Sequence, residues 1–364
     1  MDGWVRDGRL VVGGDARQRF HDARGYGRPL SGTEIELAPV EAAHLLYRED
    51  LDAVAGREFR SFAVAAASGG LDIPVPDDFF VRFLVYKDLR ERGFYLSPAR
   101  PEWTTDGIDT DGVDLIVYPR GDGPGDGRVA HRIRTLGERV PVAADTLGDC
   151  TLAVVDEESE VSYFATERPP IAGDVDLDLP DGTAATLLSE RIVCWSAPDR
   201  LHDGGFYGQP LGGRDEAGPL GLSLVEAAYL AARGGIAVDG AEAPHDDPDS
   251  AGYDAIVARG HETEGERFGR RLRTYADLRE RGVAPKTGFK FGADFRTYAE
   301  VGEGSVGHSE LLVRVVEPDH AFLPRDLALD VRLAHGVRKR MVFALVDDEP
   351  GTDPAYVAVD RLTP

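Results

Sequence analysis

The chain has 364 residues, of which 42% are hydrophobic, and a formal net charge of −24 at pH 7. This length predicts roughly two to four domains, each able to bury its own core. No apolar run is long enough to cross a membrane, and the first residues lack the apolar core of a signal peptide, so we expect a soluble cytoplasmic protein without a membrane partner. The two cysteines, Cys150 and Cys194, lack metal-ligand spacing and are expected to be free thiols.

The charged residues have an unusual composition. Asp and Glu total 65 and Lys and Arg total 41, yet only four of the basic residues are lysines. This composition is typical of proteins from a salt-rich cytoplasm. An acidic protein repels nucleic acids at low salt, but at molar salt the screening length falls to ~3 Å, so that only groups touching a ligand matter. Recognition of a nucleic acid should then depend on shape and stacking rather than on charge.

Four segments recur in the same order along the chain. Their offset drifts from 181 to 191 residues, which predicts one ancestral unit of about 180 residues used twice. We therefore predict an α/β (α+β) fold with a tandem duplication, in which each repeat joins a small α/β amino-terminal domain to a larger α/β domain with a central mixed sheet. The recurring segments are residues 21–32 and 202–213, 39–48 and 224–233, 88–93 and 277–282, and 152–158 and 343–349. The predicted domains are residues 1–70, 78–170, 185–260 and 266–364.

The second repeat shows the predicted elements best. Ser223 can cap a helix over 224–232, with Glu226 completing a capping box. One further helix should end near Arg281, and another should run over 324–335. Strands are predicted where residues alternate or run apolar, at 288–301, 308–317 and 340–349. Loops or linkers are predicted where glycine, proline and acidic residues gather, at 121–127, 167–182 and 241–252.

Two segments near the carboxyl end differ from the rest in composition. Residues 286–316 and 331–340 contain three of the four lysines. The first contains GFKFGADFR, then Tyr298 and the HSELLV run that starts at His308, and the second contains AHGVRKR with Lys339. Together these motifs resemble the catalytic domain of archaeal tRNA-splicing endonucleases. The resemblance is strong over about 90 residues and extends weakly, through the repeat, over most of the chain.

The resemblance carries expectations about fold, partners and site. It implies a restriction-endonuclease-like catalytic domain and a homodimer of the two-repeat haloarchaeal type, which cuts precursor tRNA at both splice sites of a bulge-helix-bulge. Tyr298, His308 and Lys339 match the family's catalytic residues, which cut RNA without a metal or another cofactor. The family also clamps a bulged base between two arginines, and the best matches to them are Arg332 and Arg361.

The three residue types suit strand scission by the RNA's own 2′-hydroxyl. Tyr298 would take the 2′ proton, with neighbouring cations favouring its phenolate form. Lys339 would stabilise the negative charge that develops on the phosphate, and His308 would give a proton to the departing 5′ oxygen. The products would be a 2′,3′-cyclic phosphate and a 5′-hydroxyl. DNA lacks the nucleophile and is not an expected partner.

The first repeat lacks the basic residues of the second. Aligning 152–158 on 343–349 puts Gly148 opposite Lys339. Aligning the apolar residues after Gly112 with those after His308 puts these two residues opposite each other. We therefore expect the first repeat to be an inactive structural partner.

A chain with one active repeat needs a second copy to cut two splice sites. Pairing two chains about a two-fold axis would supply two active sites in four repeats. The resemblance implies that an acidic loop of the inactive repeat docks into a basic pocket of the active repeat across this interface. The residues that match this loop are Asp156, Glu157 and Glu158.

Two other functions stay open. Singly, a half-buried packing tyrosine, a turn histidine and a solvated lysine each have a structural explanation, and the chain could be a non-catalytic RNA-binding structural subunit of a splicing complex. The complete set of Tyr298, His308 and Lys339 argues against this alternative. A metal-dependent nuclease is the second alternative, but no acidic residues cluster with a lysine on the predicted strands as such an enzyme requires.

Overall fold

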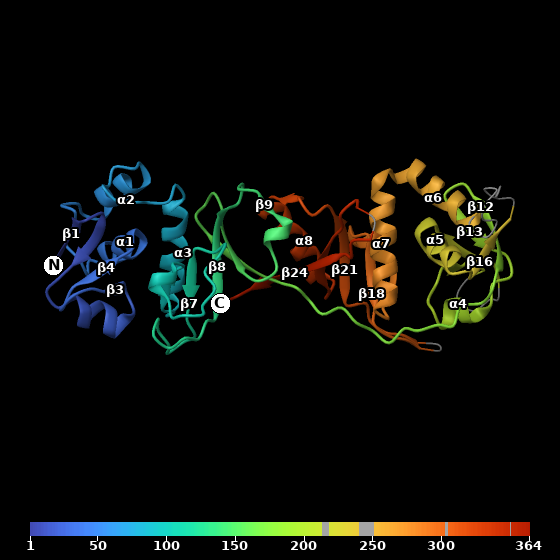
Figure 1. Cartoon of the computed structure of the whole chain (residues 1–364), viewed down its shortest axis with the longest axis horizontal. Coiled ribbons are helices and arrows are strands. Elements are labelled where there is room, and N and C mark those ends of the chain that lie inside the picture. The colour runs from blue at the N-terminus through green and yellow to red at the C-terminus, as the bar shows by residue number, and fades with distance from the viewer. Residues whose placement is uncertain (213–217, 240–250, 303–304, 350) are drawn as a thin grey trace.

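A computed structural model of the chain describes residues 1–212, 218–239, 251–302, 305–349 and 351–364. Helices and mixed sheets combine in an α/β fold, as predicted. The molecule is elongated, with a small domain at each end and two larger domains in the middle (Figure 1). We call residues 1–167 the first half and residues 183–364 the second half. The connecting residues 168–182, all of them described, form no helix or strand, as the linker prediction requires.

Each half begins with an end domain built on a five-stranded sheet. The two sheets have matching strand orders, β3-β4-β2-β1-β5 and β14-β15-β13-β12-β16, and each ends in one parallel pair. The first contains β1 Asp2–Arg6, β2 Arg9–Val12, β3 Arg28–Pro29, β4 Ile35–Leu37 and β5 Ala53–Val54, with helices α1 Pro39–Tyr47 and α2 Phe59–Ala67. The second contains β12 Thr183–Leu188, β13 Arg191–Cys194, β14 Gln209–Pro210, β15 Leu220–Ser223 and β16 Ile236–Val238, with helices α4 Asp199–Asp203 and α5 Leu224–Ala232.

The capping box predicted for the second end domain is confirmed at the start of α5. The N–H of Glu226 donates to the hydroxyl of Ser223 at 3.3 Å, and the N–H of Ser223 donates to the Glu226 carboxylate at 3.1 Å. Two backbone donors that the helix cannot satisfy are thereby paired. The predicted acidic loop, 241–252, lies outside the described residues except for its last two, which begin α6 Ala251–Glu264.

The two middle domains share one ten-stranded sheet. Its order, β17-β18-β21-β23-β24-β11-β10-β8-β7-β6, runs through the second half and then back through the first. The antiparallel pair β24 and β11 joins the halves. The strands of the first half are β6 Leu96–Pro98, β7 Leu115–Val117, β8 His131–Gly137, β10 Thr151–Val155 and β11 Val161–Glu167. Those of the second are β17 Ala284–Thr287, β18 Phe295–Tyr298, β21 Leu311–Val316, β23 Arg340–Leu345 and β24 Ala355–Leu362.

Helices cover the shared sheet unequally. Each half packs one long helix beside it, α3 Phe79–Glu91 and α7 Glu266–Glu280, and α7 ends where the sequence predicted. The predicted helix of the second half is confirmed as α8 Pro324–Gly336, which packs on β23 and β24. In the first half, β8 and β10 are joined by a shorter segment that holds only β9 Val142–Ala143 and a 3-10 turn, and β9 pairs with β22 Ala321–Phe322. Within the described residues, no helix is long and apolar enough to span a bilayer.

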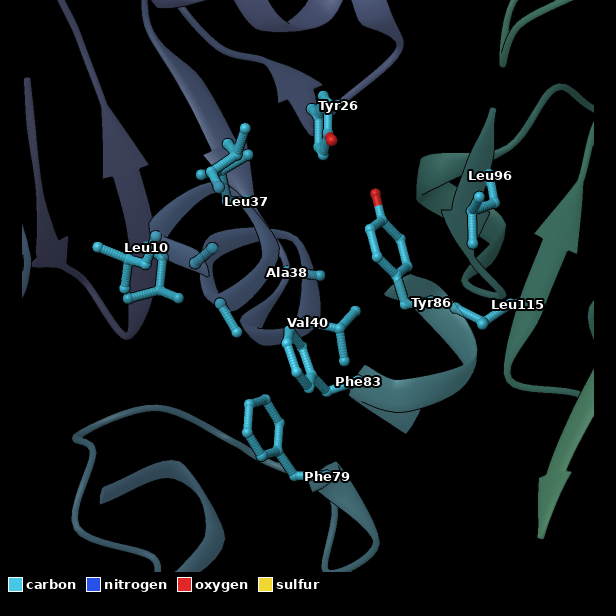
Figure 2. Packing of buried hydrophobic residues seen from close by; sticks show 14 of the residues in the cluster. Leu10, Tyr26, Leu37, Ala38, Val40, Phe79, Phe83, Tyr86, Leu96 and Leu115 are labelled. Atoms are coloured by element: carbon cyan, nitrogen blue, oxygen red, sulfur yellow. The ribbon is translucent and has the colours of Figure 1, made fainter. Parts of the chain in front are cut away.

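The hydrophobic core of each half runs from its end domain into its middle domain. In the first half, Tyr86 of α3 lies between Tyr26 of the end domain and Leu96 and Leu115 of the shared sheet, as Figure 2 shows. The second half has a matching cluster that runs from Ile192 through Tyr275 to the strands β18, β21, β23 and β24. One cluster of buried residues therefore joins the two domains of each half.

One strand prediction is confirmed only in part. Strand was expected within residues 288–301, but a 3-10 turn, Phe289–Phe291, occupies the start of this range and β18 follows it. Gly292 closes the turn with a φ of 68°, in the left-handed region that glycine adopts without steric cost. The chain reverses there, because β17 and β18 pair antiparallel and Tyr298 returns to face Ala284.

Candidate active site

The three predicted catalytic residues stand at one end of three neighbouring strands. Tyr298 is the last residue of β18, His308 lies in the loop before β21, and Lys339 directly precedes β23. β21 lies between the other two strands. The N–H of Glu310 donates to the carbonyl before Tyr298 at 3.3 Å, and the carbonyl of Glu310 accepts from the N–H after Lys339 at 2.9 Å. Tyr298 and Lys339 are therefore two strand spacings apart, roughly 10 Å between backbones.

Tyr298 lies in a small apolar cluster with a cation beside it. Its side chain is 8% exposed and packs with Val175 and Ala284. The Phe206 ring meets it edge to face, with centroids 5.1 Å apart and planes at 89°. Arg296, two residues earlier on β18 and so on the same face, lies 5.6 Å from the ring centroid. The phenol is thus held by residues of both the shared sheet and the end domain.

Lys339 is held by a hydrogen bond to the residue after His308. Its ammonium donates to the carbonyl oxygen of Ser309 at 2.7 Å, and Ser309 directly follows His308 in the chain. The ammonium also lies 5.7 Å from the Phe291 ring centroid, in the turn before β18. Lost hydration lowers the pKa of Lys339, and the nearby positive charge of Arg296 lowers it further. The charged form of this lysine is therefore less favoured than that of a fully hydrated lysine.

His308 is exposed, in contrast to the buried Tyr298. It follows the short pair β19 Val301–Gly302 and β20 Ser305–Val306. Residues 303 and 304 between these strands lie outside the described part of the chain. An exposed imidazole in this loop can approach a bound ligand from the solvent side.

Sequence reasoning missed Arg296. Its Nε atom is buried, and no hydrogen-bond partner for it exists among the described residues. The guanidinium lies close to both Tyr298 and Lys339. A buried donor without an acceptor is costly, so a group of this kind beside two candidate catalytic residues suits an anionic ligand. The available signal was its position two residues before Tyr298, which places both side chains on one face of a strand.

The two predicted RNA-clamping arginines are both exposed. Arg361 lies near the end of β24, which pairs antiparallel with β23. In this register Arg340 lies opposite Asp360, and the two form an ion pair at 2.5 Å. The next pair along the strands is Lys339 opposite Arg361. Arg361 thus extends the row of candidate residues by one strand. Arg332 lies on α8, the helix that covers β23. The structure places it on the layer above the sheet and not in the row itself.

The predicted acidic docking loop lies at the turn between β10 and β11. The Asp156 carboxylate accepts from the N–H groups of Glu158 and Glu160, each at 2.9 Å, and so shapes the turn. Glu157 forms an ion pair with Arg139 at 2.5 Å. The glutamates are exposed. The loop is therefore an ordered acidic projection with two of its three carboxylates already engaged.

A basic cleft of about 390 Å³ separates the second end domain from β17 and β18. Arg191, Arg271, Lys286 and Arg296 line it. Lys286 is neutralised by the buried Glu226 carboxylate at 2.8 Å, and Arg271 pairs with acidic residues of its own surroundings. Arg191 and Arg296 give the cleft its remaining positive charge.

At the place in the first half that corresponds to this cleft, there is a carboxylate. There Glu36 of β4 forms ion pairs with Arg28 at 2.7 Å and with Arg9 at 3.9 Å. The corresponding position on β15 is Gly221, because Glu36 and Gly221 face the same residue of the matching strands β2 and β13. The second half has thus lost both the side chain that would fill the cleft and the charge that would neutralise Arg191.

The strand order shows which first-half residues correspond to the candidate site. β7 holds the place of β18, and β8 that of β21, so aligning the residues after Gly112 with β21 was wrong. The recurring segments end two residues before Tyr95 and Ala284. The N–H of Tyr118 donates to the carbonyl of Tyr95 at 2.9 Å, just as Tyr298 pairs with Ala284. Tyr118 is therefore the counterpart of Tyr298.

The first half keeps the tyrosine but has neither the histidine nor the lysine. The register of β8 on β10 matches that of β21 on β23 at an offset of 180 residues, so the position corresponding to His308 is Arg128 and not Gly112. Arg128 pairs with Asp122 at 2.6 Å. Gly148 matches Lys339, as predicted. The Tyr118 side chain is fully buried and its hydroxyl lies 3.1 Å from that of Ser97. Burial raises the pKa of Tyr118 above its usual value.

The described residues hold no group of three His, Cys, Asp or Glu side chains placed to bind a metal ion. Cys150 and Cys194 are free thiols, as predicted. Burial raises the pKa of Cys194 to about 11, so this thiol stays protonated at neutral pH.

Comparisons with known proteins agree with the division into halves. A family model described as "tRNA intron endonuclease, catalytic C-terminal domain" matches residues 268–352, and one described as "tRNA intron endonuclease, N-terminal domain" matches twice, at residues 1–64 and 183–247. Proteins named tRNA-splicing endonuclease are 55% identical in Haloarcula marismortui, over 98% of both chains, and 51% identical in Haloferax volcanii, over 100% of both. One from Methanococcoides burtonii is 35% identical over 98% of both chains.

Proposed function

The chain belongs to the tRNA-splicing endonuclease family and is an endonuclease of tRNA splicing, and on this basis we propose how it acts. It excises introns by cutting precursor tRNA at both splice sites of a bulge-helix-bulge. The proposed catalytic residues are Tyr298, His308 and Lys339. One observation carries the assignment of the residues. The Lys339 ammonium donates to the carbonyl oxygen of Ser309, the residue after His308. Tyr298 lies two strands away, at the same end of the sheet.

The proposed reaction uses the 2′-hydroxyl of the nucleotide before the scissile bond. Tyr298, as phenolate, accepts the 2′ proton while the 2′ oxygen attacks phosphorus. Lys339 donates to the phosphoryl oxygens as negative charge develops there. The bond from phosphorus to the 5′ oxygen breaks, and His308, as imidazolium, protonates that oxygen. The products are a 2′,3′-cyclic phosphate and a 5′-hydroxyl, and no step needs a metal or another cofactor.

The matching halves support descent from one duplicated unit. Both have the same strand order in the end domain and contribute five strands to the shared sheet, and one family model matches both end domains. We assign the carboxyl-terminal domain of each unit to a restriction-endonuclease-like fold and the active site to the second unit alone. The first half would then serve as a frame, since its Tyr118 is buried and Arg128 is paired with an acid.

A homodimer would bring two active sites to one precursor tRNA. We assign the basic cleft beside β17 as the docking site for the acidic loop Asp156–Glu158 of a second chain. The cleft presents Arg191 and Arg296 without a carboxylate at the Gly221 position, so an acidic loop would supply the missing charge. Arg332 and Arg361 are assigned to bind the bulged bases at each site, because their exposed planar groups can stack on unpaired bases.

The catalytic assignment is tested with a bulge-helix-bulge RNA in EDTA. Wild-type chain should cut it and leave cyclic phosphate ends, and a substrate with a 2′-deoxy nucleotide at one scissile position should be cut only at the other. Cleavage of the 2′-deoxy site at the normal rate would refute the proposed nucleophile, and loss of activity in EDTA would refute the metal-free mechanism. A chain that binds the RNA and cuts neither substrate would instead be a structural subunit.

The docking assignment is tested by sedimentation of the chain in molar salt. Replacing Asp156, Glu157 and Glu158 by alanine should shift the chain from dimer to monomer and lower cleavage of two-site substrates. The matched control replaces Asp347, Asp348 and Glu349, which occupy the equivalent loop of the second half. A dimer that survives the first replacement would exclude the loop as the docking element.

A further inference from the structure

Phe206 adopts a backbone conformation that its side chain disfavours. It lies between α4 and β14 in the second end domain and has a φ of 53°. Bulky residues rarely adopt positive φ, because Cβ then crowds the backbone. The recurring segments HDARGYG and HDGGFYG match Phe206 to Gly25, which has a φ of 64°. The same loop is thus formed by glycine in the first half and by phenylalanine in the second.

The Phe206 ring lies against a candidate catalytic residue. Its centroid is 5.1 Å from that of Tyr298, in an edge-to-face arrangement that aromatic pairs favour. The Lys286 ammonium lies 5.2 Å from the Phe206 centroid and the His202 ring 5.5 Å from it. Phe206 is therefore held by neighbours from both domains, and its ring joins the end domain to the end of β18.

The two halves fill this space from opposite sides. In the first half the sheet supplies Tyr95, and a Cβ atom on Gly25 would come within 3.2 Å of its ring. In the second half the sheet position is Ala284, and the end domain supplies Phe206. Glycine with a large sheet residue avoids the unfavourable φ. The catalytic half has the opposite arrangement, which places the Phe206 ring perpendicular to that of Tyr298. Unfavourable backbone conformations of this kind concentrate at functional sites.

We propose that Phe206 is a positioning residue for the reaction: it fixes the plane of the Tyr298 ring so that the phenol oxygen faces the scissile nucleotide. This inference rests on the proposed catalytic role of Tyr298. It gives the second end domain a direct part in catalysis, because a loop outside the catalytic sheet orients the general base. A small rotation of a catalytic group can lower a rate by a large factor.

Single-turnover cleavage and RNA affinity test this role together. Phe206→Gly removes the ring and relieves the backbone, so the folded fraction should be preserved and the dissociation constant for RNA unchanged, while the cleavage rate falls about tenfold or more. Phe206→Tyr, which keeps an aromatic edge, should retain most of the rate, and Phe206→Leu should not. The matched control is Tyr95→Ala, which removes the ring that fills the same space in the first half and should leave the rate per folded molecule unchanged.

Combination with Tyr298→Phe separates the two proposals. If Phe206 acts through the phenol, Phe206→Gly should cause no further loss in a chain that already has Tyr298→Phe. A normal rate in Tyr298→Phe alone would refute the catalytic assignment itself. If Tyr298→Phe is slow, the positioning role is overturned by a normal rate in Phe206→Gly, by a loss that matches lower RNA affinity or a lower folded fraction, or by an equal loss in Tyr95→Ala.

Discussion

Glu41 of the first half and Glu226 of the second occupy corresponding places, yet their pKa values are shifted in opposite directions. Each is buried at the start of a helix and accepts two backbone N–H groups, from Gly27 and Ala38 for Glu41 and from Gly208 and Ser223 for Glu226. Burial raises the pKa of Glu41 to about 7. Glu226 suffers the same burial, but the Lys286 ammonium at 2.8 Å and the backbone donors outweigh it and lower its pKa to about 2.

One sheet residue accounts for the difference. The position of Lys286 on β17 is Ser97 on β6 in the first half, where the hydroxyl lies beside Tyr118 instead of beside the carboxylate. The second half thus has an ion pair between its end domain and its catalytic sheet, next to Phe206. The comparison teaches that a repeated frame can be kept while single residues at its domain boundary are changed for a site.

The largest expected difference between the halves comes from removing the hydroxyl of the corresponding tyrosine in each. Tyr298→Phe should lower the single-turnover cleavage rate by about 10²–10⁴, the usual contribution of a general base. Tyr118→Phe, in the first half, should leave the rate unchanged, because this hydroxyl is buried against Ser97. Rapid-quench measurements on a one-site RNA compare the two. Equal losses in both variants would mean that the halves do not differ in the way described.

The second effect is on stability. Lys286→Met leaves the buried Glu226 without its cation, which should cost about 3 kcal/mol of unfolding free energy at pH 7. Because the carboxyl can then take up a proton, the cost should shrink as the pH falls to 4. Ser97→Ala in the first half should cost about 1 kcal/mol at either pH, for one hydrogen bond. Denaturant titrations at the two pH values measure both, and a loss in Lys286→Met that does not depend on pH would contradict the ion-pair explanation.

The two carboxylates should also give opposite pH dependence. The folded pKa of Glu41 is above its unfolded value, so the wild type should lose up to about 3 kcal/mol as pH rises from 4.5 to 7, and Glu41→Gln should gain on it over this range. The folded pKa of Glu226 is below its unfolded value, so Glu226→Gln should lose relative to the wild type as pH rises from 2 to 4.5. Thermal unfolding across pH tests this, and parallel curves for the two variants would contradict it.

The smallest expected effect is a change in the pH dependence of cleavage. Arg296→Gln removes a cation that lowers the pKa of Lys339, so that pKa should rise and the alkaline limb of the rate profile should move to higher pH. Arg134→Gln, on β8 of the first half, serves as the control and should leave the limb in place. A limb that moves to lower pH, or does not move, would mean that Lys339 does not control it.

Local patterns predicted much of the fold, and the resemblance to a known family supplied the three candidate catalytic residues. The capped helix at Ser223, the helix over 324–335 and the linker depend on neighbours in the chain, and these were found as expected. The failures concern strands. A short apolar run such as Leu115–Val117 fits any buried strand, so the sequence could not show that it corresponds to β18 and not to β21.

Sequence alone identified Tyr298, His308 and Lys339 as candidates, because the motifs around them resemble those of a known family. Only the tertiary structure decided what surrounds them. The charge of Arg296 lowers the pKa of Lys339 from another strand, and Phe206 reaches Tyr298 from another domain, at a distance of 92 residues in the chain. Contacts of this kind depend on register and domain packing, which follow from the burial of the whole core and leave no periodic signal in the residues that make the contact.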